Sequence, residues 1–185
     1  MSVTFVSGGA QGADTLWAMW AVRQGQPMDV MSFPGHRRST VKGAKVFELS
    51  NKELDQARPH LTLAGDCLGR SLAHTSEFSM KYLLRDWHII KNADAVFAIG
   101  NLISGTPGIR VAGGTGWTCQ MYFNRGPPVN MWLFNQFDEQ WYKCSPVGDW
   151  EESIPPTPEG FTRVALIGSR EITKAGAEAI SHITL

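Results

Sequence analysis

Three glycine-rich turns in this chain each follow an apolar run and precede a segment with helical spacing. The first turn reads SGGAQGAD at residues 7–14, the second AGGTGWTCQ at 112–120, and the third GSR at 168–170. Glycines let backbone N–H groups approach a bound oxyanion closely, and the amino end of the following helix carries partial positive charge. The three turns therefore predict sites for a phosphate or a similar anion.

The glycine spacing argues against two common nucleotide motifs. No Lys follows Gly12, as G-x-x-x-x-G-K-[ST] requires, and the first turn lacks the full G-x-G-x-x-G spacing. A phosphate-bearing ligand is therefore expected without a specific indication of ATP or NAD. The residues expected to contact this ligand are Ser7, Gly8, Gly9, Ala10, Gln11, Gly12, Asp14, Gly113, Gly114, Thr115, Gly116, Trp117, Thr118, Gly168, Ser169 and Arg170.

Three of these residues have a structural interpretation beside the functional one. Asp14 is suited to accept a ribose hydroxyl, or to cap the free N–H groups of its own helix. Arg170 is suited to a bidentate phosphate contact, or to a surface ion pair. Trp117 is suited to stacking on a base, or to filling the core. The sequence leaves both interpretations open for each residue.

The elements that must position these turns alternate along the chain. Short apolar runs typical of strands alternate with segments of helical spacing. Two of these segments lie on either side of Pro59, and a stronger helix lies near residue 80. This alternation indicates a single α/β domain over residues 1–185, with a Rossmann-like, doubly wound and mostly parallel sheet and helices on both faces. The carboxyl ends of parallel strands meet at one edge, so the three turns are expected to line one crevice. The predicted strands are 3–6, 28–33, 95–99, 129–134, 140–144 and 164–167. The first predicted helix opens from the first glycine turn and ends near residues 24–25, and the others are 46–54, 61–72, 76–91, 119–123 and 173–183.

Composition narrows the class of protein. Of the 185 residues, 43% are hydrophobic, which is enough for one sizeable core. Lys plus Arg and Asp plus Glu both total 17, so no overall basic charge attracts a nucleic acid. The cysteines form no C-x-x-C pair and no two histidines are spaced i, i+4, so no disulfide framework, metal site or cofactor is expected. Without a long apolar run or a signal segment, we expect a soluble cytoplasmic protein that does not contact membranes.

Four segments, VSGGAQGAD, NADAVFAIG, AGGTGW and ALIGSREIT at residues 6–14, 92–100, 112–117 and 165–173, resemble motifs of the SLOG superfamily. That group joins the DNA-processing protein A (Smf) family with the LONELY GUY nucleotide hydrolases. The resemblance implies a Rossmann-like fold whose loops bind nucleotides, nucleotide-derived signals or single-stranded DNA. It also implies a homodimer, with which the strongly apolar first helix agrees.

The order of the motifs differs from that of the DNA-processing family. There, a strand ending in GSR comes first and SGGA follows it, whereas GSR here lies near the end of the chain, at residues 168–170. The chain therefore resembles a circularly permuted member. Joining the last helix to the first strand would restore the familiar order. This interpretation predicts that the strand at 164–167 lies beside the strand at 3–6.

The resemblance to the LONELY GUY enzymes suggests two catalytic positions. Arg85, nine residues before Asp94, matches their catalytic Arg, and Gln120 stands where their PGGxGTxxE motif has Glu. Cleavage of a nucleoside monophosphate develops positive charge on the sugar, which a carboxylate stabilises better than an amide. Glu77 and Asp86 are candidate replacements, or else a helix-start charge and a surface group.

Three functions follow from these observations. The first is binding of a nucleotide-like small molecule at the glycine turns, for sensing or sequestration. The second is hydrolysis of nucleoside 5′-monophosphates by an N-glycosidase (phosphoribohydrolase). The third is binding of single-stranded DNA through the basic segment 37–45 and nearby aromatic residues, which the neutral net charge places last.

Overall fold

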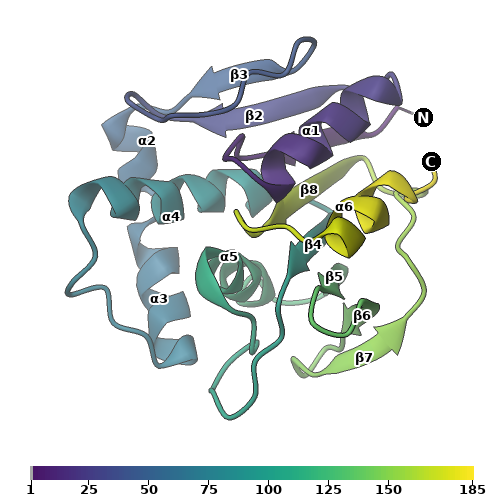
Figure 1. Cartoon of the computed structure of the whole chain (residues 1–185). Coiled ribbons are helices and arrows are strands. Elements are labelled where there is room, and N and C mark those ends of the chain that lie inside the picture. The colour runs from purple at the N-terminus through teal and green to yellow at the C-terminus, as the bar shows by residue number, and fades with distance from the viewer. Residues whose placement is uncertain (1) are drawn as a thin grey trace.

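A single sheet of eight strands organises the fold, in the order β3-β2-β1-β8-β4-β5-β6-β7 (Figure 1). The computed structural model describes residues 2–185. The first six strands in this order run parallel, and β6 and β7 are antiparallel to their neighbours. The strands are β1 (Thr4–Ser7), β2 (Met28–Ser32), β3 (Lys45–Glu48), β4 (Ala95–Gly100), β5 (Met131–Asn135), β6 (Gln140–Cys144), β7 (Trp150–Ser153) and β8 (Arg163–Gly168).

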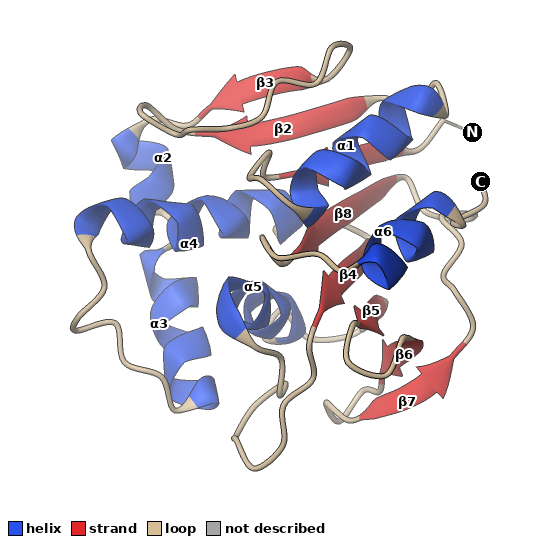
Figure 2. Cartoon of the chain, viewed as in Figure 1, coloured by secondary structure: helices blue, strands red, loops and turns tan. Residues whose placement is uncertain are grey.

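Helices cover both faces of this sheet (Figure 2). One face packs against α1 and α6, and the other against the remaining helices. Side chains of β1 alternate accordingly, because Phe5 belongs to the apolar cluster on the α1 side and Val6 to the cluster on the α4 side. The protein therefore has an α/β fold with a mostly parallel sheet, consistent with a Rossmann-like architecture. The helices are α1 (Ala13–Arg23), α2 (Asn51–Asp55), α3 (Arg58–Leu68), α4 (Glu77–Ile90), α5 (Gly113–Phe123) and α6 (Lys174–Ser181).

The strand β8 lies between β1 and β4, although it is the last strand in the chain. Phe5 is the register partner of Val164, and Val96 is the partner of Ala165. This arrangement confirms the prediction that the strand at 164–167 lies beside the strand at 3–6. In addition, Val3 and Ile183 belong to the same apolar cluster, so the two ends of the chain meet the same part of the core.

The chain reverses direction across the sheet around β8. From β1 it proceeds through α1 to β2 and β3, whereas from β4 it proceeds through α5 to β5 on the other side. The crossover helices therefore leave on opposite faces, and the carboxyl ends of β1, β8 and β4 surround a crevice between them. Such a reversal is where open α/β sheets bind ligands.

Three local predictions were wrong. Residues 46–48, expected at the start of a helix, belong to the edge strand β3, and the helix begins only at Asn51, where Ser50 and Glu53 form a capping box. The strand β7 was not predicted, because its sequence WEES has no alternation, and it forms by pairing with β6. The second glycine turn is shorter than expected, since α5 already begins at Gly113.

The first helix packs entirely within its own chain on its aromatic side. Trp17 and Trp20 are both buried, and each contacts the other edge-on. Trp17 donates a hydrogen bond from Nε1 to the carbonyl of Ile167 in β8. Both indoles therefore stabilise the contact between α1 and the sheet.

Across residues 2–185, no helix combines the length and apolar character needed to cross a bilayer.

Candidate functional site

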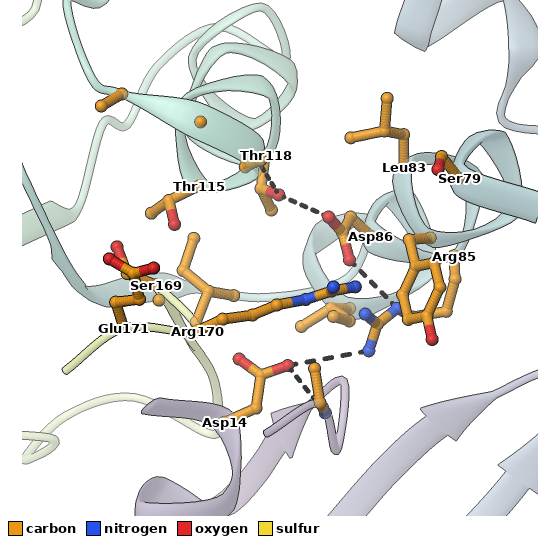
Figure 3. A pocket seen from close by; sticks show the side chains of 18 of the residues that line it. Asp14, Ser79, Leu83, Arg85, Asp86, Thr115, Thr118, Ser169, Arg170 and Glu171 are labelled. Carbon is orange, nitrogen blue, oxygen red and sulfur yellow. Dashed lines mark hydrogen bonds and ion pairs between the residues drawn. The ribbon is translucent and has the colours of Figure 1, made fainter. Parts of the chain in front are cut away.

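A cleft of about 490 Å³ opens at the carboxyl ends of β1, β8 and β4 (Figure 3). This volume lies within the range of roughly 300–1,000 Å³ that is usual for small-molecule sites. Segments from all three glycine turns line the cleft, and α4 closes one side of it. Of the residues predicted from the sequence, the cleft brings together Ala10, Asp14, Arg85, Gly113, Gly114, Thr115, Thr118, Gly168, Ser169 and Arg170.

The amino end of α5 faces this cleft with free backbone N–H groups. Ala112 precedes the helix in an extended conformation and provides no side-chain cap. The first intrahelical bond runs from Gly116 N to the Ala112 carbonyl, so the amides of Gly113, Gly114 and Thr115 have no acceptor in the described part of the chain. A Cβ at Gly113 or Gly114 would meet nothing within 4 Å. These amides and the helix dipole are therefore available to an anion.

Arg85 on α4 forms the floor of the cleft. Its side chain is only 4% exposed, and Nη1 lies 3.8 Å from Asp14 Oδ2 while Nε lies 3.0 Å from Asp86 Oδ1. The second contact is an ion pair without hydrogen-bond geometry, so Nε has no hydrogen-bond partner. Nη1 also approaches the Met31 carbonyl at 3.5 Å. One guanidinium group thus bridges carboxylates from two different elements.

The two carboxylates differ in their other partners. Asp86 Oδ2 accepts a hydrogen bond of 2.9 Å from Thr118 Oγ1, which joins α4 to α5. Asp14 Oδ2 accepts one of 3.3 Å from the Ala10 amide. Burial raises the pKa of Asp14 to about 6, although the nearby Arg85 guanidinium opposes the change. Burial also raises the pKa of Asp86, against the effect of Arg85. The cleft therefore contains two carboxyl groups that bind protons more tightly than usual.

Arg170 crosses the cleft toward α4, where its guanidinium carbon lies 4.9 Å from the centre of the Tyr82 ring. The side chain of Arg170 is exposed and has no carboxylate within 4.0 Å among residues 2–185. The Tyr82 ring in turn contacts Phe33 and His36 edge-on. Arg170 is therefore a cation in the cleft without an ion-pair partner, held against an aromatic surface.

Most of the first glycine turn does not reach the cleft, contrary to expectation. Gly8 packs against Arg85, and a Cβ at Gly12 would lie 2.2 Å from the Arg170 carbonyl. The first amide of α1, from Ala13, donates to the Ser169 carbonyl at 3.0 Å. Close packing of the first and third turns against each other thus occupies backbone groups that were expected to bind an anion. The residues of this turn that do not line the cleft are Ser7, Gly8, Gly9, Gln11 and Gly12.

Three predicted residues of the second turn are also absent from the cleft. Gln120 is buried, where Oε1 accepts from the Ile109 amide at 2.8 Å and Nε2 donates to Asn124 at 2.9 Å. It therefore holds the preceding loop, and the structure does not place it at a reaction centre. Trp117 is buried in the core, in agreement with its structural interpretation. Gly116 faces the Val111 carbonyl, which leaves no space for a side chain.

Two cleft residues on α4 were missed or undervalued from the sequence. No motif in the sequence points to Tyr82, and the sequence leaves open whether Asp86 is a site carboxylate or a surface group. Helical spacing offered a signal, since Ser79, Tyr82, Asp86 and Ile89 recur at three and four residues and line the cleft together. Glu77, the other candidate carboxylate, is exposed and lies outside this cleft.

Comparisons with protein-family models, with curated proteins and with solved structures give no match for this chain. Within residues 2–185, no three His, Cys, Asp or Glu side chains gather in a way that would hold a metal ion.

Proposed function

We propose that the cleft binds a phosphate-bearing nucleotide or nucleotide-derived ligand, with the phosphate at the amino end of α5. The observation that carries this proposal is the set of free amides from Gly113 to Thr115, open to a cleft that also contains the unpaired cation Arg170. Backbone amides and a guanidinium group are the usual protein partners of a phosphate. We therefore expect the anion at the second glycine turn and not at the first.

The opposite wall of the cleft suits the remainder of a nucleotide. The Tyr82 ring on α4 is a surface on which a base can stack. Asp14 and Asp86 supply carboxylate oxygens that accept hydrogen bonds from sugar hydroxyls or from amino groups of a base. The cleft thus offers both donors and acceptors to a polar ligand that carries a phosphate.

The resemblance to the SLOG superfamily supports the same function. The pairing of β1 with β8 also supports a circularly permuted order, because the strand ending in GSR lies where a first strand preceding SGGA would lie. We propose both the superfamily membership and the permutation on this basis.

A thermal-shift screen of nucleoside 5′-monophosphates against the matching nucleosides tests the proposal. A ligand that binds the folded state raises the melting temperature in a concentration-dependent way. We expect stabilisation by the monophosphates and little or none by the nucleosides. Gly114→Val, which places a branched side chain in the open space before the amides, should abolish the difference. Equal shifts from nucleosides and monophosphates would contradict a phosphate site.

Cleavage of the glycosidic bond is a second candidate function, favoured by the two carboxyl groups around Arg85. Because burial raises the pKa of both groups, a carboxyl group here can hold a proton to donate to the departing base, while a carboxylate can stabilise positive charge on the sugar. Water then completes the reaction, giving free base and a sugar phosphate. Chromatography of monophosphates incubated with the protein tests this, and Asp86→Asn should stop any release of base.

A further inference from the structure

Arg70 lies behind the amino end of α5, outside the cleft itself. It follows Gly69, whose left-handed conformation ends α3. Its Nη2 donates a hydrogen bond of 2.7 Å to the Val111 carbonyl, and its Nη1 donates one of 3.1 Å to the Gly113 carbonyl. The Arg70 side chain, just after α3, thus binds the backbone on both sides of Ala112, the residue that precedes α5.

The bond to Gly113 fixes the direction of the next amide. In a trans peptide the carbonyl of one residue and the N–H of the next point in opposite directions. Because the Gly113 carbonyl points to Arg70, the Gly114 N–H points away from Arg70, and Gly114 lines the cleft. Gly113 itself has a φ of +61°, which glycine adopts readily and other residues rarely do. The orientation of this peptide therefore depends on a glycine and on the guanidinium group that holds it.

The charge of Arg70 is unfavourably placed unless an anion is near. Cations are disfavoured at the amino end of a helix, where the dipole is positive. Arg70 has no carboxylate within 4.0 Å in the chain from residue 2 onward, and burial lowers its pKa. Local conflicts of this kind are concentrated at functional sites. Independently, Arg85 lines the same cleft almost fully buried, with no hydrogen-bond partner for Nε.

We infer that Arg70 is a positioning residue of the anion site at α5. It orients the Gly114 amide toward the cleft and adds positive charge behind it, without itself touching the ligand. This inference rests on the proposed function, because it assigns a role at the same site. It identifies a residue that neither the glycine motifs nor the lining of the cleft reveals.

Titration with inorganic phosphate, followed through the amide resonances of ¹⁵N-labelled protein, tests this role. In the wild-type protein the Gly114 and Thr115 resonances should shift until saturation. Arg70→Met should raise the dissociation constant about two- to fivefold, the order expected for losing a charge near a helix end that does not touch the ligand. Arg70→Lys keeps the charge but loses the two-pronged contact, so its dissociation constant should fall between the two. Arg58→Met, which removes an exposed cation at the start of α3, should bind like the wild-type protein.

The outcomes separate this inference from the proposed function. If the wild-type resonances do not respond to phosphate, the anion site itself is rejected, and the role of Arg70 with it. If the wild-type protein binds phosphate and both Arg70 variants bind it equally well, only the role of Arg70 is rejected. If Arg70→Met does not fold, Arg70→Lys decides, and wild-type affinity in that variant would overturn the positioning role. A merely structural role would lower the melting temperature of unliganded Arg70→Lys and leave the phosphate affinity of the folded fraction unchanged.

Discussion

Arg85 lies directly against the bare Cα of Gly8, and its Nη1 atom is 1.4 Å from the position that a Cβ at residue 8 would occupy. The glycine that the sequence suggested for an anion thus makes room for a buried cation. This relationship connects β1 to α4 and places the guanidinium between Asp14 and Asp86. The packing of the cleft floor therefore depends on the absence of one side chain.

Gly8→Ala should consequently destabilise the protein. The added methyl group cannot coexist with the guanidinium, so Arg85 must shift away from its carboxylates, at a cost of about 1–3 kcal/mol in the free energy of unfolding. Urea denaturation measures this change. Gly114→Ala is the matched control, because its methyl group meets nothing within 4 Å and helices favour Ala. Equal stability of both variants would show that Arg85 has room to move at no cost.

Arg85→Met should destabilise the protein more strongly, by roughly 3–5 kcal/mol near neutral pH, because it leaves two buried carboxyl groups without their cation. In contrast, Arg58→Met removes an exposed ion pair with Asp55, which should change the free energy of unfolding by less than about 1 kcal/mol. Denaturant titrations of the two variants under the same conditions provide the comparison. If the free energy of unfolding falls as little in Arg85→Met as in Arg58→Met, water already screens the charges of Arg85, Asp14 and Asp86.

The titration of Asp14 should make the free energy of unfolding depend on pH. Burial raises its pKa from the ordinary value of 3.8 to about 6, so the folded protein holds this proton more tightly than the unfolded chain. Ionisation then removes stability as pH rises from about 4 to about 6. Relative to Asp14→Asn, the wild-type protein should lose up to roughly 3 kcal/mol across this range. If the wild-type protein instead gains stability relative to the variant as pH rises, the attraction of Arg85 outweighs the effect of burial on the pKa of Asp14.

A circularly permuted variant of the chain should fold to the same structure. In this variant a short Gly/Ser linker joins the ends of the chain, and new ends are opened between the exposed residues Glu159 and Gly160, which lie between β7 and β8. Because β1 pairs with β8, and Val3 shares an apolar cluster with Ile183, the linker does not need to cross the molecule. Circular dichroism and the melting temperature should match those of the native order. A permuted chain that remains unfolded would contradict the close approach of the ends.

The arrangement of the sheet was largely predictable from the sequence, because buried parallel strands are short apolar runs that stand apart from their helices. The strand at Arg163–Gly168 and the helix at Glu77–Ile90 both lie where periodicity places them. Edge strands were harder, since β3 and β7 are exposed and owe their conformation to pairing with a neighbour. Their sequences carry little burial pattern for periodicity to detect.

The edge of the sheet that carries the cleft was predictable, but the role of each glycine within it was not. A glycine can admit an anion, a neighbouring side chain or another backbone. In this protein Gly8 admits Arg85 and Gly12 admits the backbone of Arg170, while Gly113 and Gly114 face open space. Which of these occurs depends on packing between segments that are far apart in the sequence, which local spacing does not encode. Arg70 escaped prediction for the same reason.

A crystal structure of the protein with a bound nucleoside 5′-monophosphate tests the central claim most directly. The account predicts phosphate oxygens within hydrogen-bonding distance of the Gly114 and Thr115 amides, with the rest of the ligand extending toward Tyr82 and Arg170. A phosphate held elsewhere, such as on the basic segment 37–45, with the amino end of α5 left free, would contradict it.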